Sequence, residues 1–130
     1  MLKDVGVVFS DDREATELTG RRPLLLCFSH LRWDFVFQRP QHLMSRFAAT
    51  HNVHFWEEPV FEPDGTERLE IRNAGNVTLV IPHLADGLDE FEVEDRLRHM
   101  VTEHVGTTTP EILWYYTPMM LTFSRHLEAV

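Results

Sequence analysis

Residues 23–29 read PLLLCFS and are the most hydrophobic stretch of the chain. A continuous apolar run that ends in polar residues is typical of a central parallel β-strand buried on both faces. Parallel strands need crossover connections, usually helices, and the following sequence supplies one. Leu43, Met44, Phe47 and Ala48 recur at the spacing of a helix face, and Pro40 suits the first helical turn.

The rest of the chain continues this alternation of strands and helices. The predicted elements are a strand at 53–59 stopped by Pro59, a hairpin or strand pair at 68–72 and 77–82, a helix opened by Asp89, Glu90 and Glu92, a buried strand at 111–117, and a helical segment from Pro118. This order predicts an α/β fold, a Rossmann-like three-layer sandwich with a mainly parallel sheet.

The length of 130 residues predicts one domain with a single core. Residues 1–22 show no clear helical or strand period, so we expect a flexible arm or a short edge strand there. Residues 23–130 form the predicted Rossmann-like domain. Its last helix is not followed by a further strand, so we expect the domain to be incomplete.

Charge and composition exclude several classes of protein. The net charge of −9 argues against nucleic-acid binding, and no apolar run is long enough to cross a membrane. Residues 1–22 lack the pattern of a signal peptide, which predicts a cytoplasmic location. The single cysteine, Cys27, lies inside the apolar run, so we expect a small buried side chain rather than a nucleophile.

Ligands of open α/β sheets bind outside the carboxyl ends of the strands, which directs attention to the residues after the first strand. A dinucleotide or phosphate loop would need glycines there, and none lies between Cys27 and Gln41. Glu57 stands where a ribose-binding acid would stand, but an acid alone is weak evidence and a solvated strand end is the preferred explanation. The sequence therefore predicts no nucleotide cofactor of the Rossmann type.

The loop after the first strand offers side chains instead of bare backbone. His30, Arg32 and Arg39 could present hydrogen-bond donors to an anion near a helix N-terminus. Trp33 could stack on a sugar ring, and Gln41 suits hydroxyl groups. A purely structural alternative stays open for Arg32 and Trp33, in which the aromatic residues cover the sheet and Asp34 pairs with Arg39.

Two other chemistries are disfavoured by residue spacing. The eight histidines show no spacing of a zinc site, so no metal is predicted. Glu57 and Glu58 are neighbours in a predicted strand, so their side chains should point to opposite faces. They should not act together as a glycosidase-type acid/base pair.

The segment CFSHLRWDFVFQRPQHLMSRFA, at 27–48, resembles the N-terminal part of a group of bacterial glycosyltransferases. These enzymes have the two-domain GT-B fold, are related to retaining family 4, and include the teichuronic-acid group and sequences associated with UDP-galactopyranose mutase. VHFWEEP, VTLVIPHL and ILWYYTPMM follow in the same order and support the resemblance. It covers residues 23–126, and the SHLRWDFVFQRPQHL block is its most specific part.

This resemblance implies the acceptor-side, N-terminal half of a GT-B enzyme. The parent enzyme would move a sugar from a nucleotide-sugar to a cell-surface glycan or a lipid-linked acceptor, and would need no metal. The resemblance implies that the acceptor cleft is lined by His30, Arg32, Trp33, Arg39, Gln41, Glu57, Glu58 and Thr117. The donor-binding C-terminal domain is absent, so we expect the isolated chain to be inactive.

A second hypothesis is a non-catalytic Rossmann-like module for interaction or dimerisation. An incomplete sheet leaves an edge open, and an open edge can pair with another strand. Partners compatible with the glycosyltransferase hypothesis are the nucleotide-sugar donor, the glycan or lipid acceptor, a second copy, and a membrane surface at its cytoplasmic face. The donor sugar, the acceptor, the linkage and the stereochemical outcome are not readable from the sequence.

Overall fold

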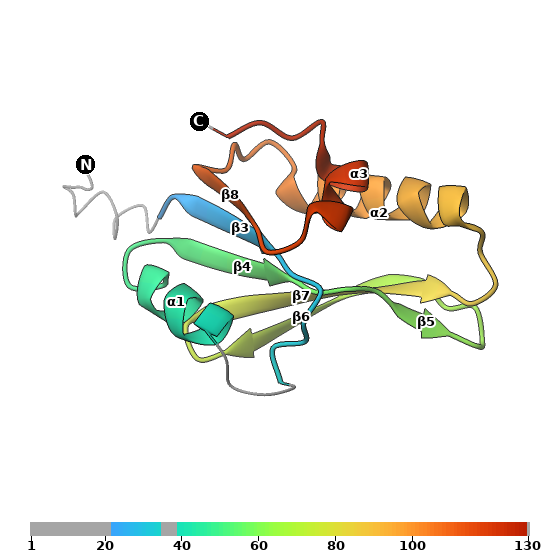
Figure 1. Ribbon diagram of the computed structural model, residues 1–130, viewed down its shortest axis with the longest axis horizontal. Coiled ribbons are helices and arrows are strands. Elements are labelled where there is room, and N and C mark those ends of the chain that lie inside the picture. The colour runs from blue at the N-terminus through green and yellow to red at the C-terminus, as the bar shows by residue number, and fades with distance from the viewer. Residues whose placement is uncertain (1–21, 35–38, 130) are drawn as a thin grey trace.

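The computed structural model describes residues 22–34 and 39–129, and of these the side chains of Arg39 and Pro40 are not described (Figure 1). Its elements in chain order are β3 (Leu24–Phe28), α1 (Arg39–Phe47), β4 (Asn52–Trp56), β5 (Val60–Glu62), β6 (Arg68–Ala74), β7 (Val77–Ala85), α2 (Glu90–Val105), β8 (Ile112–Tyr115), the 3₁₀ helix η2 (Pro118–Met120) and α3 (Leu121–Ser124). The fold is α/β with a mainly parallel sheet, as the sequence predicts. The predicted arm lies outside the described residues except for Arg22.

β3 lies inside the sheet and pairs in parallel with β4 on one side and β8 on the other. β4 and then β5 pair in parallel with β7, and β6 pairs antiparallel with β7 on its far side. The chain thus moves outward from β3 to β7 before α2 carries it back across to β8. This reversal of direction beside β3 marks a topological switch point, where doubly wound folds bind ligands.

Helices cover both faces of the sheet, with α1 on one side and α2 with α3 on the other (Figure 1). Leu25 and Cys27 of β3 pack toward α1, whereas Leu26 and Phe28 pack toward α2 and α3. All four side chains are fully buried. Burial on both faces explains why this strand is a continuous apolar run instead of an alternating one.

The predicted hairpin and the second predicted helix are confirmed. β6 and β7 pair over their whole facing lengths around the turn at Gly75, whose positive φ of 63° suits glycine. Asp89 caps α2, because its side chain accepts a hydrogen bond from the Glu92 backbone while the Glu92 side chain accepts one from the Asp89 backbone. Gly106 ends the helix, as predicted.

Three predicted boundaries are wrong. β4 ends at Trp56 instead of Pro59, and the short strand β5, which the sequence did not predict, follows after a break. The strand at 111–117 is shorter and half-buried, because β8 is the end strand of the described sheet. The last helical segment ends at Ser124, and only four of its residues are α-helical.

None of the helices in the described part of the chain is both long and apolar enough to cross a membrane.

Candidate functional site

Ser29 turns the chain at the carboxyl end of β3. Its backbone N–H donates to the carbonyl of Trp56 over 3.0 Å, and its Oγ accepts the N–H of Leu31 over 3.0 Å. A serine that binds the backbone two residues on closes a tight turn without glycine. The turn brings the next residues of the loop to the carboxyl end of β4.

Glu57 is the first residue after β4, and its side chain is only 2% exposed. Its backbone N–H donates to the carbonyl of Val80 on β7 over 2.9 Å, which holds the chain at the break before β5. Its Oε2 accepts the backbone N–H of Trp33 over 2.9 Å, and its Oε1 lies 3.3 Å from Nη1 of Arg32. A buried carboxylate needs such partners, because an unpaired charge in the interior is strongly unfavourable.

Arg32 spans the break between β4 and β5. Its Nη1 donates to the carbonyl of Glu58 over 2.7 Å, and its Nη2 donates to that of Pro59 over 3.2 Å. Its Nη2 also lies 3.8 Å from the carboxylate of Glu58. Both glutamates therefore approach one guanidinium, and the expectation that they diverge on a strand is wrong because both lie outside β4.

Trp33 and Gln41 complete the group. Nε2 of the buried Gln41, on α1, donates to the carbonyl of Trp33 over 2.6 Å. The ring of Trp33 packs edge-on against Phe55, with 5.0 Å between ring centroids. We call the set of Arg32, Trp33, Gln41, Glu57 and Glu58 the carboxyl-edge clasp. Five of the eight predicted site residues thus lie together.

The other three predicted site residues lie apart from the carboxyl-edge clasp or are not fully described. His30 is exposed in the loop after Ser29. Thr117 is buried after β8, on the opposite side of β3 from Glu57, where its side chain accepts the N–H of Met119. Arg39 begins α1, and nothing is described of its side chain. Residues 35–38 of the same loop lie outside the described residues.

The sequence interpretation missed a row of charged side chains beside the clasp. Asp34 contacts Arg72 over 3.0 Å, Arg72 contacts Glu70 over 3.4 Å, and the ring of the buried His83 lies between Glu70 and Glu62. The His83 nitrogens are 2.7 Å and 2.6 Å from these carboxylates. The hydrogen bond from His83 lowers the pKa of Glu70. Only tertiary structure brings these strands together, so no sequence spacing could reveal the row. The predicted pair of Asp34 with Arg39 stays a prediction.

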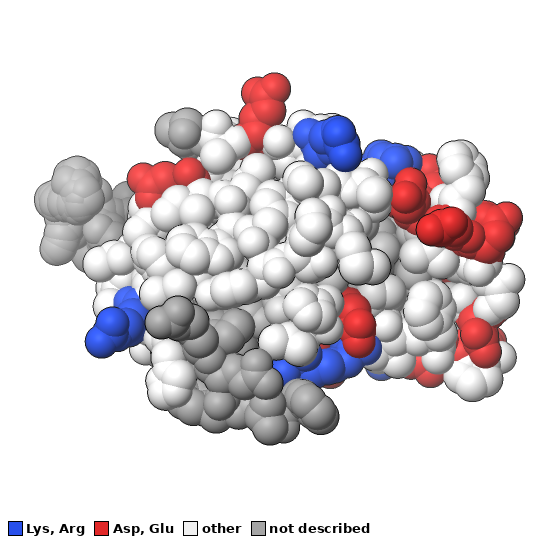
Figure 2. Space-filling view, viewed as in Figure 1, with Lys and Arg blue, Asp and Glu red and all other residues white. Residues whose placement is uncertain are grey.

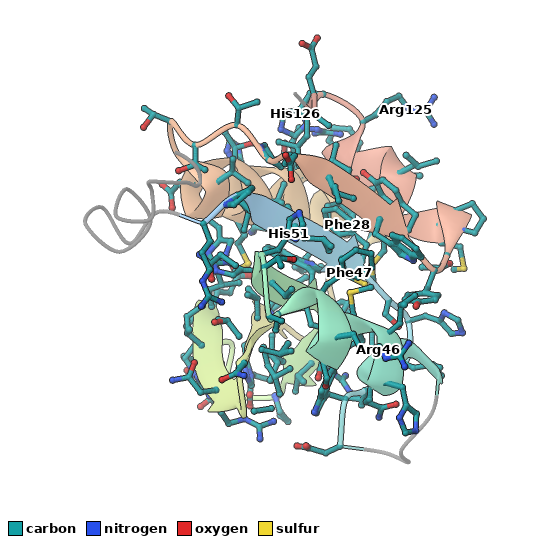
Figure 3. All side chains as sticks on the ribbon, turned by 90° about the vertical axis from the view of Figure 1, so that its left-hand side faces the viewer. Phe28, Arg46, Phe47, His51, Arg125 and His126 are labelled. Carbon is teal, nitrogen blue, oxygen red and sulfur yellow. The ribbon has the colours of Figure 1, made fainter. Side chains whose placement is uncertain are left out.

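Several histidines lie outside the clasp, and one of them, His51, directly precedes β4 and is labelled beside Phe47 in Figure 3. His51 stacks edge-on against Phe47 with 5.7 Å between ring centroids, and its Nε2 is 2.7 Å from the Glu111 carboxylate. His54 and His104 lie within hydrogen-bond distance of one another. No group of three metal-ligating side chains that could hold a metal ion occurs within residues 22–34 and 39–129.

Cys27 is fully buried between the layers, and burial raises the pKa of its thiol far above the ordinary value. A thiol kept protonated is a poor nucleophile, so its role is packing, as the sequence predicts. In the carboxyl-edge clasp, in contrast, the charged groups of Arg32 and Glu57 fix the position of the loop after β3. It can hold loop backbone and the Trp33 ring in one position at the carboxyl ends of β3 and β4.

Comparisons were made with models of known families, with curated proteins and with solved structures. None of the three finds a match.

Proposed function

We propose that this chain is the acceptor-side domain of a bacterial glycosyltransferase of the GT-B type. Its parent enzyme transfers a sugar from a nucleotide-sugar to a cell-surface glycan or a lipid-linked acceptor on the cytoplasmic side of the membrane. The observation that carries the proposal is the loop after β3. It contains no glycine, and the buried Glu57 holds it at the carboxyl edge of the sheet, where ligands of doubly wound folds bind.

The clasp supports this function by fixing the loop before a ligand arrives. Arg32 is engaged by Glu57 and by two backbone carbonyls, so in the proposed site it acts on the loop more than on the ligand. The exposed His30 of this loop is then available to meet acceptor hydroxyl groups. A loop held in one conformation loses less entropy on binding, which strengthens binding of an acceptor.

The test compares this chain with a longer gene product that contains a second Rossmann-like domain. We expect transfer from UDP-glucose or UDP-galactose only with the longer protein, and no turnover by the isolated chain. In the longer protein, Arg32→Ala and Trp33→Ala should weaken acceptor use by at least about tenfold, whereas Arg98→Ala on the exposed side of α2 should not. Turnover by the isolated chain, or parental activity in both loop variants, contradicts the proposal.

A second candidate function, an interaction module, is favoured by the sheet edge at β8. β6, at the opposite end of the sheet, carries Arg68, Glu70 and Arg72, as protected edge strands do. β8 reads ILWY and carries no charge, and the surface over it shows few charged side chains in Figure 2. An uncharged edge strand can pair with another strand.

Sedimentation equilibrium of the isolated chain tests this second function. A module that works through β8 should self-associate at micromolar concentration, and Leu113→Lys should abolish the association. A chain that stays monomeric up to about a hundred micromolar contradicts dimerisation through this edge.

A further inference from the structure

His54 and His104 join the sheet to helix α2. His54 is the middle residue of β4, and His104 lies in the last turn of α2. Nδ1 of His54 is 2.8 Å from Nε2 of His104, and the ring centroids are 4.9 Å apart. The two residues are separated by 50 positions in the chain, so this contact ties together elements that are distant in sequence.

A hydrogen bond between two imidazole nitrogens needs one donor and one acceptor. An imidazole nitrogen accepts only when it carries no proton, so at least one of the two rings must be neutral. Protonation of both rings places two N–H groups and two positive charges face to face. We propose that the His54–His104 pair is an acid-sensitive latch that fastens the last turn of α2 to the sheet. This inference is independent of the proposed transferase function.

The surroundings of the pair offer little compensation for a positive charge. The neighbours of His54 on the adjacent strands are Leu26 of β3 and Thr78 of β7, which carry no charge. The titratable groups close to the pair in the chain, or in contact with the last turns of α2, are engaged or exposed: His51 contacts Glu111, His126 contacts Thr102 on α2, and Glu103 is exposed.

Burial and the charge of the neighbouring ring both disfavour protonation of His54. Burial, and then the charge of His104, lower the pKa of His54 to about 4, and burial lowers the pKa of His104. The ordinary histidine pKa is about 6.5 in an unfolded chain. The unfolded chain therefore binds more protons below that pH, and the stability of the fold decreases as the pH falls toward 4.

His104 contacts a tryptophan ring whose buried N–H water could satisfy. The ring of Trp56 packs edge-on against His104, with 6.0 Å between centroids. Its Nε1 is buried and has no hydrogen-bond partner in the part of the chain that the structure describes. When the latch opens, water that enters can accept this N–H, which favours the open state further. The buried Val101 and Val105 of α2 would be uncovered with it.

The experiment measures urea unfolding of the full chain between about pH 7 and about pH 5, for the wild type and for His54→Gln/His104→Gln. Glutamine keeps a donor and an acceptor but does not titrate in this range. We expect the unfolding equilibrium constant of the wild type to rise on the order of tenfold more than that of the double variant over this range. Hydrogen exchange should show the additional opening at the last turn of α2.

His99→Gln provides the matched control, because His99 lies on the same helix with a 75% exposed side chain. It should keep the pH dependence of the wild type. A double variant that follows the wild type at every pH overturns the latch. If the double variant does not fold, NMR titration of His54 in the wild type decides: a midpoint well below the ordinary 6.5 supports the latch, and one at or above it overturns it.

Discussion

The backbone N–H of Trp33 donates a hydrogen bond of 2.9 Å to the buried carboxylate of Glu57, 24 residues further along the chain. This bond joins the loop after β3 to the end of β4. It is supported by Arg32, which binds the same carboxylate and the two following carbonyls.

Replacing Glu57 by glutamine should destabilise the fold. The amide has only one acceptor oxygen, so either Arg32 or the N–H of Trp33 loses its partner in a buried site. We expect the free energy of unfolding to fall by about 1–3 kcal/mol, measured by urea denaturation. Glu128→Gln is the control, because Glu128 is exposed and lies outside the clasp. Its effect should stay within about 0.5 kcal/mol, and equal effects of the two variants contradict the role of the clasp.

Replacing His83 by glutamine should raise the pKa of Glu70 toward its ordinary value. His83 lowers this pKa in the fold, so the carboxylate contributes stability above the unfolded pKa and loses it as the pH falls through the folded value. The stability difference between the wild type and His83→Gln should therefore be larger near pH 6 than near pH 3. NMR titration of the Glu70 carboxyl carbon measures the shift. An unchanged titration in the variant refutes the assignment.

Replacing Asp89 by alanine should remove the cap of α2. The Glu92 N–H loses its acceptor, and the free energy of unfolding should fall by about 1 kcal/mol. Thermal or urea denaturation measures the change. Glu103→Gln, at the exposed opposite end of the helix, should be neutral or slightly stabilising, because it removes a negative charge near the C-terminus. A neutral Asp89→Ala variant would show that the capping box contributes nothing to stability.

Cys27 should not react with thiol reagents in the folded protein. Its side chain is fully buried and its thiol pKa is raised by burial, so neither access nor the thiolate form favours reaction. We expect one equivalent of thiol to react with a disulfide reagent after denaturation in urea. In native buffer near pH 8, labelling should be limited by unfolding. Rapid native labelling contradicts the packing role.

The sequence predicted those parts of the fold that depend on local pattern. The apolar run before Ser29 predicts a buried strand, and Gly75 marks the turn of a hairpin. The acidic residues at the start of α2 mark the N-terminus of a helix. The break after Trp56 was not predicted, because Pro59 was the first residue that clearly stops a strand. The chain leaves the strand there, where Glu57 is held by the loop after β3.

The candidate site, like the fold, was predictable from the sequence only in part. The sequence placed polar side chains after β3 and after β4, because parallel strands end at a common edge. It did not show that Arg32 and Glu57 bind each other, and it missed His83 between Glu62 and Glu70. The row around His83 joins three strands whose pairing depends on the whole sheet.

By itself the sequence determined the fold class, the central strand, the hairpin and the extent of α2, because each follows from interactions between residues close in the chain. Tertiary structure alone decided the partners of the buried Glu57 and of His54. Glu57 meets Arg32 at a separation of 25 residues, and His54 meets His104 at a separation of 50. Such pairs form because burial removes water as a partner, and which groups then meet depends on how the layers pack.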